Sequence, residues 1–256
     1  SSSHHYLAVM LGVMSNGNAV VPLDIQMNVE TLADCLNRSD VDILFYDWEH
    51  QPLVEGVKNL CPGIKSYISL QHGKHVPCSD NILKEFAGRT ATPNVSENNC
   101  AMILFTSGTT GKGKGVMLSN RNLIDNTFCT TDTALTENEV YLNILPIHHV
   151  FCVHSDVLVT MRDGSLLCLN RDMSKLVDHL KLFEPTAFSV VPMVAKALYN
   201  RYCLLKKQQP EKSDEEIKAE VYGRRLRKVS CGGGYLTPEL AENYRDLGMS
   251  IAQGYG

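Results

Sequence analysis

Short apolar runs alternate with segments of helical periodicity along most of the chain. The runs at 41–46, 140–145 and 187–191 are rich in aliphatic and aromatic residues and are expected to be strands. Between such runs, apolar residues recur every three or four positions, which indicates helices with one buried face. Strands that alternate with helices form right-handed crossovers, and these produce a parallel sheet covered on both faces. The sequence therefore predicts an α/β fold of repeated βαβ units, with mostly parallel sheets and helices on both faces.

Capping residues mark where some of the helices begin and end. Asn28 and Thr237 stand directly before helical patterns, where a side-chain oxygen can accept a hydrogen bond from a backbone N–H group. Pro238 occupies the first helical position after Thr237, and Gly248 follows the same pattern as a stop signal. We therefore expect helices that begin at positions 29 and 238.

Composition argues against several classes of protein. Hydrophobic residues make up 44% of the 256 residues, enough for a sizeable core. The net charge of −4 disfavours a nucleic-acid partner, and no uncharged apolar run approaches the roughly 18 residues of a transmembrane segment. Nine cysteines lie scattered without a Cys-x-x-Cys pair, which is typical of a reducing compartment and favours a cytoplasmic protein. The opening residues Ser1–His5 carry no signal-like pattern.

One polar stretch, Thr106–Gly115, contains four glycines, four hydroxyl side chains and two lysines between two apolar strands. Glycine lets backbone N–H groups approach a ligand closely, and hydroxyls and lysines add donors for phosphate oxygens. This composition favours a polyphosphate site over a flexible linker, which seldom carries two lysines between strands. A Walker A loop is disfavoured, because Gly115 stands where Ser or Thr would bind Mg²⁺ and a strand follows in place of a helix.

The sequence from Phe105 to Val116 resembles the AMP-binding signature of the adenylate-forming enzymes, which include acyl-CoA synthetases, the adenylation domains of peptide synthetases, and luciferases. Gly113 departs from the family pattern, in which proline or another small residue is common, and Asn120 stands where histidine is frequent. The resemblance implies that the stretch holds the β- and γ-phosphates of ATP, and that Lys114 also has a catalytic part. The residues assigned to nucleotide binding in this way are Thr106, Ser107, Gly108, Thr109, Thr110, Gly111, Lys112 and Lys114.

A histidine pair follows the strand expected at 140–145, at the end of a strand where parallel sheets bind their ligands. It lies in the segment Leu145–Phe151, and the residues alone favour structural and functional interpretations of His148 and His149 about equally. Acyl-CoA synthetases have a similar Leu-Pro-x-x-His-x-Phe segment beside the carboxylate and adenylate site. The resemblance therefore implies a catalytic part for His149 and no direct contact for His148.

A run of three glycines, Gly232–Gly234, follows another expected strand and precedes a capped helix. It is either a tight turn that needs glycine for its geometry or a flat, side-chain-free wall for a purine. Similar segments line the adenine and the acyl group in the family, although Tyr235 replaces a residue that is often small or proline. The end of the chain resembles a family segment whose tyrosine stacks on adenine. The resemblance thus adds Gly232, Gly233, Gly234, Tyr255 and Gly256 to the expected nucleotide site.

Several family segments are not found in these 256 residues. They are the Thr-Glu pair whose glutamate holds Mg²⁺, the aspartate that holds the ribose, and the catalytic lysine of a mobile C-terminal domain. The resemblance implies part of the larger N-terminal domain, with a first α/β subdomain over 1–98 and AMP-binding subdomains over 99–256. It also implies that these residues alone are inactive, and it assigns them no metal ligand.

The resemblance implies ATP-dependent activation of a carboxylic acid to acyl-AMP, followed by transfer to coenzyme A, with Mg²⁺ as a further cofactor. The segments Leu145–His149 and Cys231–Leu236 look most like those of fatty acyl-CoA synthetases, which implies a medium- or long-chain acid. Two alternatives stay open. In the first, the acceptor is a carrier-protein thiol or an amine in place of coenzyme A. In the second, the protein is a nucleotide-binding module without catalysis.

Overall fold

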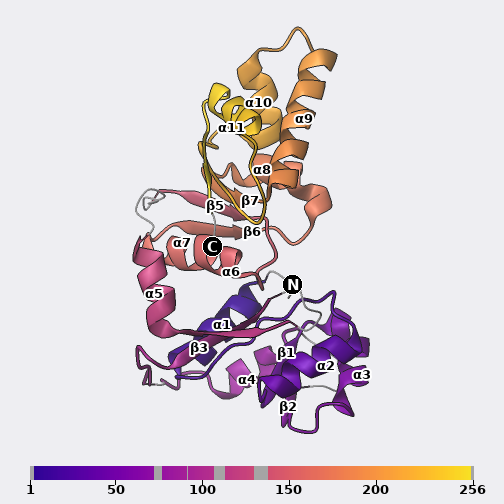
Figure 1. Ribbon diagram of the computed structural model, residues 1–256, viewed down its shortest axis with the longest axis vertical. Coiled ribbons are helices and arrows are strands. Elements are labelled where there is room, and N and C mark those ends of the chain that lie inside the picture. Colours follow the sequence, from indigo (N-terminus) through magenta and orange to yellow (C-terminus); the bar gives the residue numbers. More distant parts are fainter. Residues whose placement is uncertain (1–2, 72–76, 91, 107–112, 130–137, 255–256) are drawn as a thin grey trace. The chain divides into compact units, whose positions relative to one another are not determined.

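The computed structural model describes residues 3–71, 77–90, 92–106, 113–129 and 138–254, and it contains two compact units, Ser3–Ile124 and Asp125–Gly256 (Figure 1). Domain boundaries were expected at 98/99, whereas the compact units divide at 124/125. The reason is that the strand beginning at Cys100 belongs to the first unit, where Met102 forms a parallel bridge with Val20. The subdomain assignment itself stays a prediction. Among the described residues, no helix is long and apolar enough to span a bilayer.

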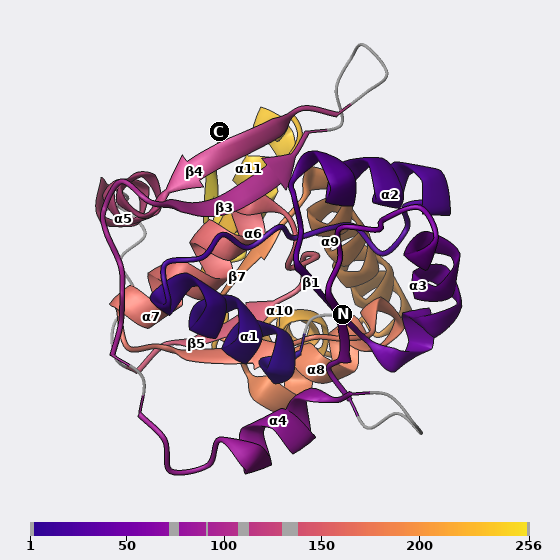
Figure 2. The ribbon, with the colours of Figure 1, turned by 90° about the horizontal axis from the view of Figure 1, so that it is seen from below.

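The first unit combines two small sheets with helices. Strands β1 (Ile43–Tyr46) and β2 (Ser66–Ser69) pair in parallel, while β3 (Cys100–Phe105) and β4 (Gly115–Ser119) form the antiparallel ribbon that is seen in Figure 2. Its helical elements are α1 (His4–Ser15), α2 (Val29–Arg38), η1 (Trp48–His50), α3 (Gln51–Lys58) and α4 (Ser79–Glu85), and α5 (Asn120–Cys129) begins in this unit.

Local sequence signals explain where α2 begins. The side chain of Asn28 accepts a hydrogen bond from the backbone N–H of Thr31, which satisfies one of the free donors of the first helical turn. Leu32 and Leu36 lie on one face of the helix and pack with Val57 of α3 in a small hydrophobic core. The predicted cap and the predicted start at position 29 are both confirmed.

The second unit is built on a five-stranded parallel sheet with the order β6-β5-β7-β8-β9. Its strands are β5 (Val140–Asn143), β6 (Leu166–Leu169), β7 (Ala187–Val190), β8 (Lys228–Cys231) and β9 (Ser250–Gln253). Its helical elements are α6 (Val150–Cys152), the π-helix η2 (Val153–Leu158), α7 (Val159–Arg162), η3 (Met173–Lys175), α8 (Leu176–Phe183), α9 (Pro192–Gln208), α10 (Asp214–Tyr222) and α11 (Pro238–Asp246).

Helices cover both faces of this sheet, as Figure 1 shows. Because side chains alternate along a strand, Leu142 and Phe188 face the large core formed with α8–α11. Tyr141 and Ala187 face the other side, where they pack with Val159 of α7. The predicted α/β fold, with a parallel sheet and helices on both faces, is confirmed.

Candidate functional site

The strand order of the second unit creates a switch point between β5 and β7. The chain leaves β5 toward β6 at one edge of the sheet and then continues through β7, β8 and β9 on the other side. In open α/β sheets the connections on the two sides of such a point diverge, and ligands bind outside the carboxyl ends of the strands there. The segments that follow β5, β7, β8 and β9 therefore share the edge at which an open α/β sheet binds its ligand.

His149 lies in the turn that follows β5. Its backbone N–H donates to the carbonyl of Pro146 at 3.1 Å, and its extended backbone (φ −80°, ψ 139°) places it at the N-cap position of α6. The side chain of His149 is exposed, whereas that of His148 is half-buried, with 4.4 Å between the two ring centroids. His149 is thus placed where a ligand can reach it, and its catalytic part stays a prediction.

The glycine run follows β8 at the same edge of the sheet. A Cβ atom on Gly232 would lie 2.9 Å from Cζ of Phe151, so a side chain there would have to displace the ring. Gly233 has a φ of 70°, which side chains disfavour. Gly232 is buried under the Phe151 ring, while Gly233 and Gly234 are exposed. Packing therefore explains the glycine at 232, and backbone geometry explains the glycine at 233. Gly233 and Gly234 present a backbone without side chains to the solvent.

Phe151 joins the ends of two strands at this edge. Its ring contacts the position of Gly232 after β8 and lies 3.8 Å from the position of a Cβ atom on Gly254 after β9. The ring comes from α6, directly after His149 and Val150. The turns after β5, β8 and β9 are consequently held together by one aromatic side chain.

A buried polar cluster beneath the His149 turn was missed from the sequence. Asn143 and Asp156 are completely buried, and the Nδ2 of Asn143 donates to Oδ2 of Asp156 at 2.7 Å. Burial raises the pKa of Asp156 to about 6, while hydrogen bonding from Asn143 and Ser189 opposes the rise. One signal could have revealed the cluster: Asp156 is the only acidic residue in the mostly apolar helical segment 150–161.

In the first unit, the two described ends of the expected phosphate loop form a continuation of the β3–β4 ribbon. The N–H of Thr106 donates to the carbonyl of Lys114 at 3.0 Å, and the N–H of Lys114 donates to Oγ1 of Thr106 at 3.4 Å. A Cβ atom on Gly113 would lie 2.4 Å from the Thr106 carbonyl oxygen, which leaves room only for glycine.

Arg38 of α2 supports this hairpin and was not singled out from the sequence. Its Nη1 donates to the Gly113 carbonyl at 2.8 Å, and its guanidinium lies over the ring of Phe105. The predicted site residues Ser107, Gly108, Thr109, Thr110, Gly111, Lys112, Tyr255 and Gly256 lie outside the described residues. Lys114 and Thr106 belong to the first unit, and His149 and Gly232–Gly234 belong to the second.

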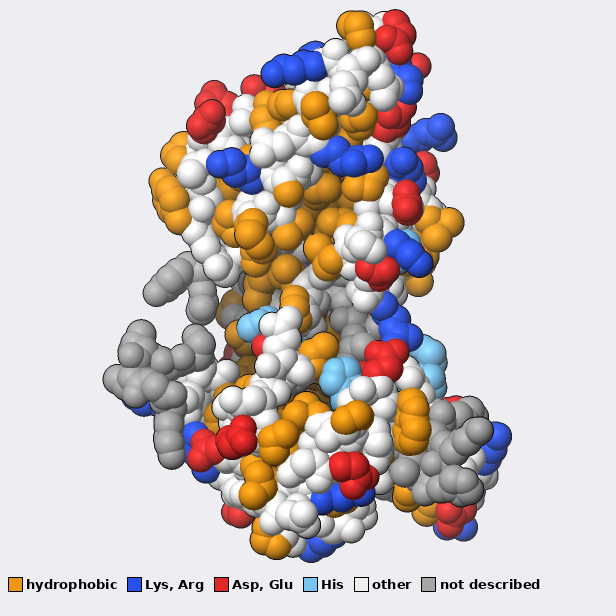
Figure 3. Space-filling model, turned by 90° about the vertical axis from the view of Figure 1, so that its right-hand side faces the viewer, with side chains coloured by type: hydrophobic (Ala, Val, Ile, Leu, Met, Phe, Trp, Pro, Cys, Tyr) orange, Lys and Arg blue, Asp and Glu red, His pale blue; other side chains and the backbone are white. Residues whose placement is uncertain are grey.

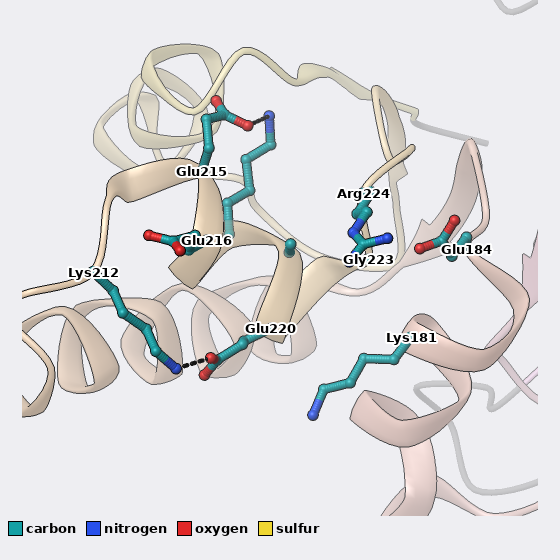
Figure 4. Close-up of a pocket in the computed structure, with 10 residues that line it drawn as sticks. Lys181, Glu184, Lys212, Glu215, Glu216, Glu220, Gly223 and Arg224 are labelled. Atoms are coloured by element: carbon teal, nitrogen blue, oxygen red, sulfur yellow. Dashed lines mark hydrogen bonds and ion pairs between the residues drawn. The ribbon is translucent and has the colours of Figure 1, made fainter.

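A hollow of about 720 Å³ lies near the amino ends of β7 and β8. It is lined by α8, α10 and the turns that lead into these strands (Figure 4). Its lining contains as many basic as acidic side chains, and two ion pairs lie among them: Lys212 bonds to Glu220, and Lys218 lies 3.8 Å from Glu215. Because the charges balance and the carboxyl ends of the strands lie elsewhere, we assign no ligand to this hollow.

On the face in Figure 3, acidic and basic side chains are interspersed over the helices of the second unit, with hydrophobic side chains between them. The described residues contain no group of three His, Cys, Asp or Glu side chains that could hold a metal ion. No step that involves Mg²⁺ is therefore assigned to them.

Comparison with known proteins identifies the class to which this fold and site belong. The family described as AMP-binding enzyme matches residues 1–256, and the chain belongs to that family of adenylate-forming enzymes. The resemblance inferred from residues 105–116 is thereby confirmed.

The similar proteins include CoA ligases and a CoA-ligase-like protein. Long-chain-fatty-acid–CoA ligase 1 of Homo sapiens is 26% identical over 219 residues, a match that covers 77% of this chain and 31% of the ligase. 4-Coumarate–CoA ligase-like 6 of Arabidopsis thaliana is 30% identical over 186 residues, with 69% and 31% covered. The chain thus spans about a third of the length of the curated relatives that it matches.

Solved structures share the fold at lower identity. The adenylation domain of a carboxylate reductase from Mycobacterium chelonae superposes with a TM-score of 0.85 at 19% identity, covering 100% of this chain and 45% of that one. An anthranilate CoA ligase in complex with anthranoyl-AMP gives a TM-score of 0.83 at 16% identity, covering 99% and 48%. These likenesses establish the fold of adenylate-forming enzyme domains.

Proposed function

We propose that the full-length protein activates a carboxylic acid, a medium- or long-chain fatty acid, with ATP and transfers the acyl group to coenzyme A. The observation that carries this proposal is the arrangement at the carboxyl edge of the parallel sheet. There an exposed imidazole, His149, follows β5, and an exposed, side-chain-free backbone, Gly233–Gly234, follows β8. An adenylate needs a flat surface for its base and a polar group beside its acyl phosphate, and these two features would supply both.

In the proposed first step a carboxylate oxygen attacks the α-phosphorus of ATP. The new P–O bond forms acyl-AMP as the bond to pyrophosphate breaks. In the second step the thiolate of coenzyme A attacks the acyl carbon, and AMP leaves. The protein contributes by positioning its substrates and by neutralising charge. His149 would border the carboxylate and the adenylate, and Lys114 with the other residues proposed for the phosphate loop would hold the pyrophosphate portion.

The choice of a fatty acid is supported by the long-chain-fatty-acid–CoA ligases among the relatives, at 26% identity in the human case. A different acceptor is the second candidate, because an amide bond synthetase from Marinactinospora thermotolerans shares the fold with a TM-score of 0.79. That similarity, at 17% identity, concerns the fold alone. The third candidate is a nucleotide-binding module without catalysis.

The test is pyrophosphate exchange by the full-length protein. Purified protein is incubated with ATP, Mg²⁺, labelled pyrophosphate and acids of two, eight, twelve and sixteen carbons, and the label that enters ATP is counted. We expect exchange that depends on the acid and is greatest for the longer chains. Thioester formation with coenzyme A, compared with a carrier-protein thiol and an amine, then identifies the acceptor. Absence of exchange with every acid, despite ATP binding, would favour the non-catalytic module.

We also propose that the 256 residues alone do not make acyl-CoA. The residues that the family uses to hold Mg²⁺ and the ribose are not among them, and each missing charged partner typically costs on the order of 10²–10³ in rate. Incubation of the 256-residue chain, beside the full-length protein, with ATP, Mg²⁺, a fatty acid and coenzyme A checks this. Thioester formation at a rate near that of the full-length protein would overturn it.

A further inference from the structure

The buried cluster beneath the His149 turn consists of Tyr141, Asn143, Cys152, Asp156 and Ser189. These side chains come from β5, β7, α6 and the π-helix η2, and each is at most 3% exposed. Polar groups at such depth lower the stability of a protein unless they are hydrogen-bonded. Oδ1 of Asp156 makes no hydrogen bond within the described residues. Packing alone therefore does not explain a carboxyl group at this position.

Asn143 is the centre of the cluster. Its Nδ2 donates to Oδ2 of Asp156 at 2.7 Å and to the backbone carbonyl of Leu145 at 2.9 Å. The Sγ of Cys152 lies 3.3 Å from the same carboxylate oxygen and 3.6 Å from the same carbonyl. The carboxylate of Asp156 thus accepts from the Nδ2 group of Asn143 and keeps that same group directed at the Leu145 carbonyl.

The carbonyl of Leu145 begins the turn that carries His149. Between them lie three residues, and the turn closes with the hydrogen bond from the His149 N–H to the Pro146 carbonyl at 3.1 Å. A displacement of the Leu145 carbonyl therefore passes through a short, hydrogen-bonded turn to the imidazole. The chain of contacts runs from Asp156 through Asn143 and Leu145 to His149.

Asp156 lies within a local irregularity of its helix. Residues Val153–Leu158 form a π-helix between the α-helical segments α6 and α7. Wide turns of this kind are rare and occur mostly at functional sites. The hydroxyl of Thr160 donates to the backbone carbonyls of Asp156 and Val157, which adds a second irregularity to the helical bonding.

We propose that Asp156 is a positioning residue, which acts through Asn143 to hold the turn that presents His149 at the carboxyl edge of the sheet. The kinetic part of this inference rests on the proposed function. The groups that face Asp156 are Tyr141 and Asn143 of β5, Ser189 of β7 and Cys152 of α6. Burial raises the pKa of Tyr141 and of Cys152, so both are neutral at neutral pH.

The kinetic test uses the full-length protein and the rate of acyl-AMP formation per folded molecule. Asp156→Ala removes the acceptor for Asn143, and we expect a roughly tenfold lower kcat, the size of effect that follows from one lost buried hydrogen bond. Asp156→Asn keeps an oxygen that accepts from Asn143, so kcat should stay within about twofold. Thr160→Val is the matched control, because it removes a buried hydroxyl from the same helix and leaves the Asn143 contacts intact.

A double-mutant cycle separates positioning from general loss of structure. If Asp156 acts through His149, Asp156→Ala has no further effect on kcat in a His149→Ala background. An equal loss of kcat in both backgrounds would overturn the proposal, as would a loss in Thr160→Val as large as that in Asp156→Ala. Should Asp156→Ala fail to fold, Asp156→Ser, whose side chain is too short to reach Asn143, takes its place.

A second measurement does not depend on the reaction. The imidazole cross-peak of His149 is recorded by NMR in the ligand-free full-length protein and assigned by its loss in His149→Ala. We expect it to shift in Asp156→Ala and to stay in place in Asp156→Asn and Thr160→Val. An unchanged His149 signal in Asp156→Ala overturns the positioning role. A shifted signal in a protein that activates no acid would support the positioning role and reject the proposed function.

Discussion

The acidity of Asp156 is set by its burial. Burial raises its pKa from an ordinary 3.8 to about 6, and the hydrogen bond from Asn143 only partly opposes the rise. A carboxyl group whose pKa is higher in the folded state binds its proton more tightly there. The stabilisation of the folded protein by this bound proton is fully present below about pH 4 and is lost as the pH rises through about 6. A difference of about two pKa units corresponds to ~3 kcal/mol.

We expect Asp156→Asn to stabilise the protein at pH 7 and to change its stability little at pH 4. The gain in unfolding free energy at pH 7 should be up to ~3 kcal/mol, because the neutral amide has no ionised form to desolvate. Urea unfolding at intervals from pH 4 to pH 8 measures it. The control is Asp172→Asn, which should lower the stability at pH 7, because hydrogen bonds from Ser174 lower the pKa of the exposed Asp172. A gain that is equal at both ends of the pH range would contradict this account.

The glycines after β8 have different reasons to be glycine, and two substitutions separate them. Gly232→Ala places a methyl group 2.9 Å from Phe151, and we expect a loss of about 1–3 kcal/mol in unfolding free energy. Gly234→Ala is the matched comparison, because its Cβ atom would meet Pro192 at an ordinary 3.4 Å. It should keep the stability of the protein and weaken ATP binding, measured by calorimetry on the full-length protein. Equal stability of both variants would show that the Phe151 contact is not tight.

At the scale of helices and strands, single capping residues and stop signals were predictive, whereas one reciprocal capping motif was overlooked. The caps Asn28 and Thr237 and the stop at Gly248 are confirmed, because each acts on its own neighbours in sequence. Helix α10 was not predicted from the sequence. The overlooked signal was the capping box, in which the Ser213 side chain accepts from the Glu216 N–H while the Glu216 carboxylate accepts from the Ser213 N–H.

We expect Ser213→Ala to lower the unfolding free energy by about 1 kcal/mol, because it leaves a donor of the first turn of α10 without its partner. The loss should be larger than that of Ser250→Ala, which replaces an exposed serine at the start of β9. Hydrogen exchange localises the effect: the first-turn amides of α10 should exchange faster while those of α9 stay unchanged. Faster exchange throughout both helices would indicate a global effect in place of a lost cap.

At the scale of the whole chain, the candidate site depends on contacts that no local pattern encodes. The sequence predicted strands followed by ligand-binding turns, and His149 and Gly232 are indeed found after parallel strands of one sheet. The order that makes β5 and β7 neighbours could not be predicted, because it is fixed by burial of Leu142 and Phe188 against helices far along the chain. The Asn143–Asp156 contact was missed for the same reason, since it forms only after the sheet and η2 pack together.

The second unit has a core of its own, and we expect residues 125–256 to fold when expressed alone. Its sheet is covered by α8–α11 on one face and by α7 on the other, so its buried side chains find their partners within the same residues. A unit of this size normally unfolds as one cooperative system. Urea unfolding followed by far-UV circular dichroism and by tyrosine fluorescence should give coincident transitions.

The single tryptophan of the chain, Trp48, supplies the matching measurement on the 256 residues. It lies in η1 of the first unit, so its fluorescence reports that unit, while circular dichroism reports both. If the units fold separately, circular dichroism should show two transitions. One should share its midpoint with the Trp48 transition, and the other should match that of residues 125–256 alone. A broad, non-cooperative transition of the isolated residues 125–256 would show that the sheet needs the first unit in order to fold.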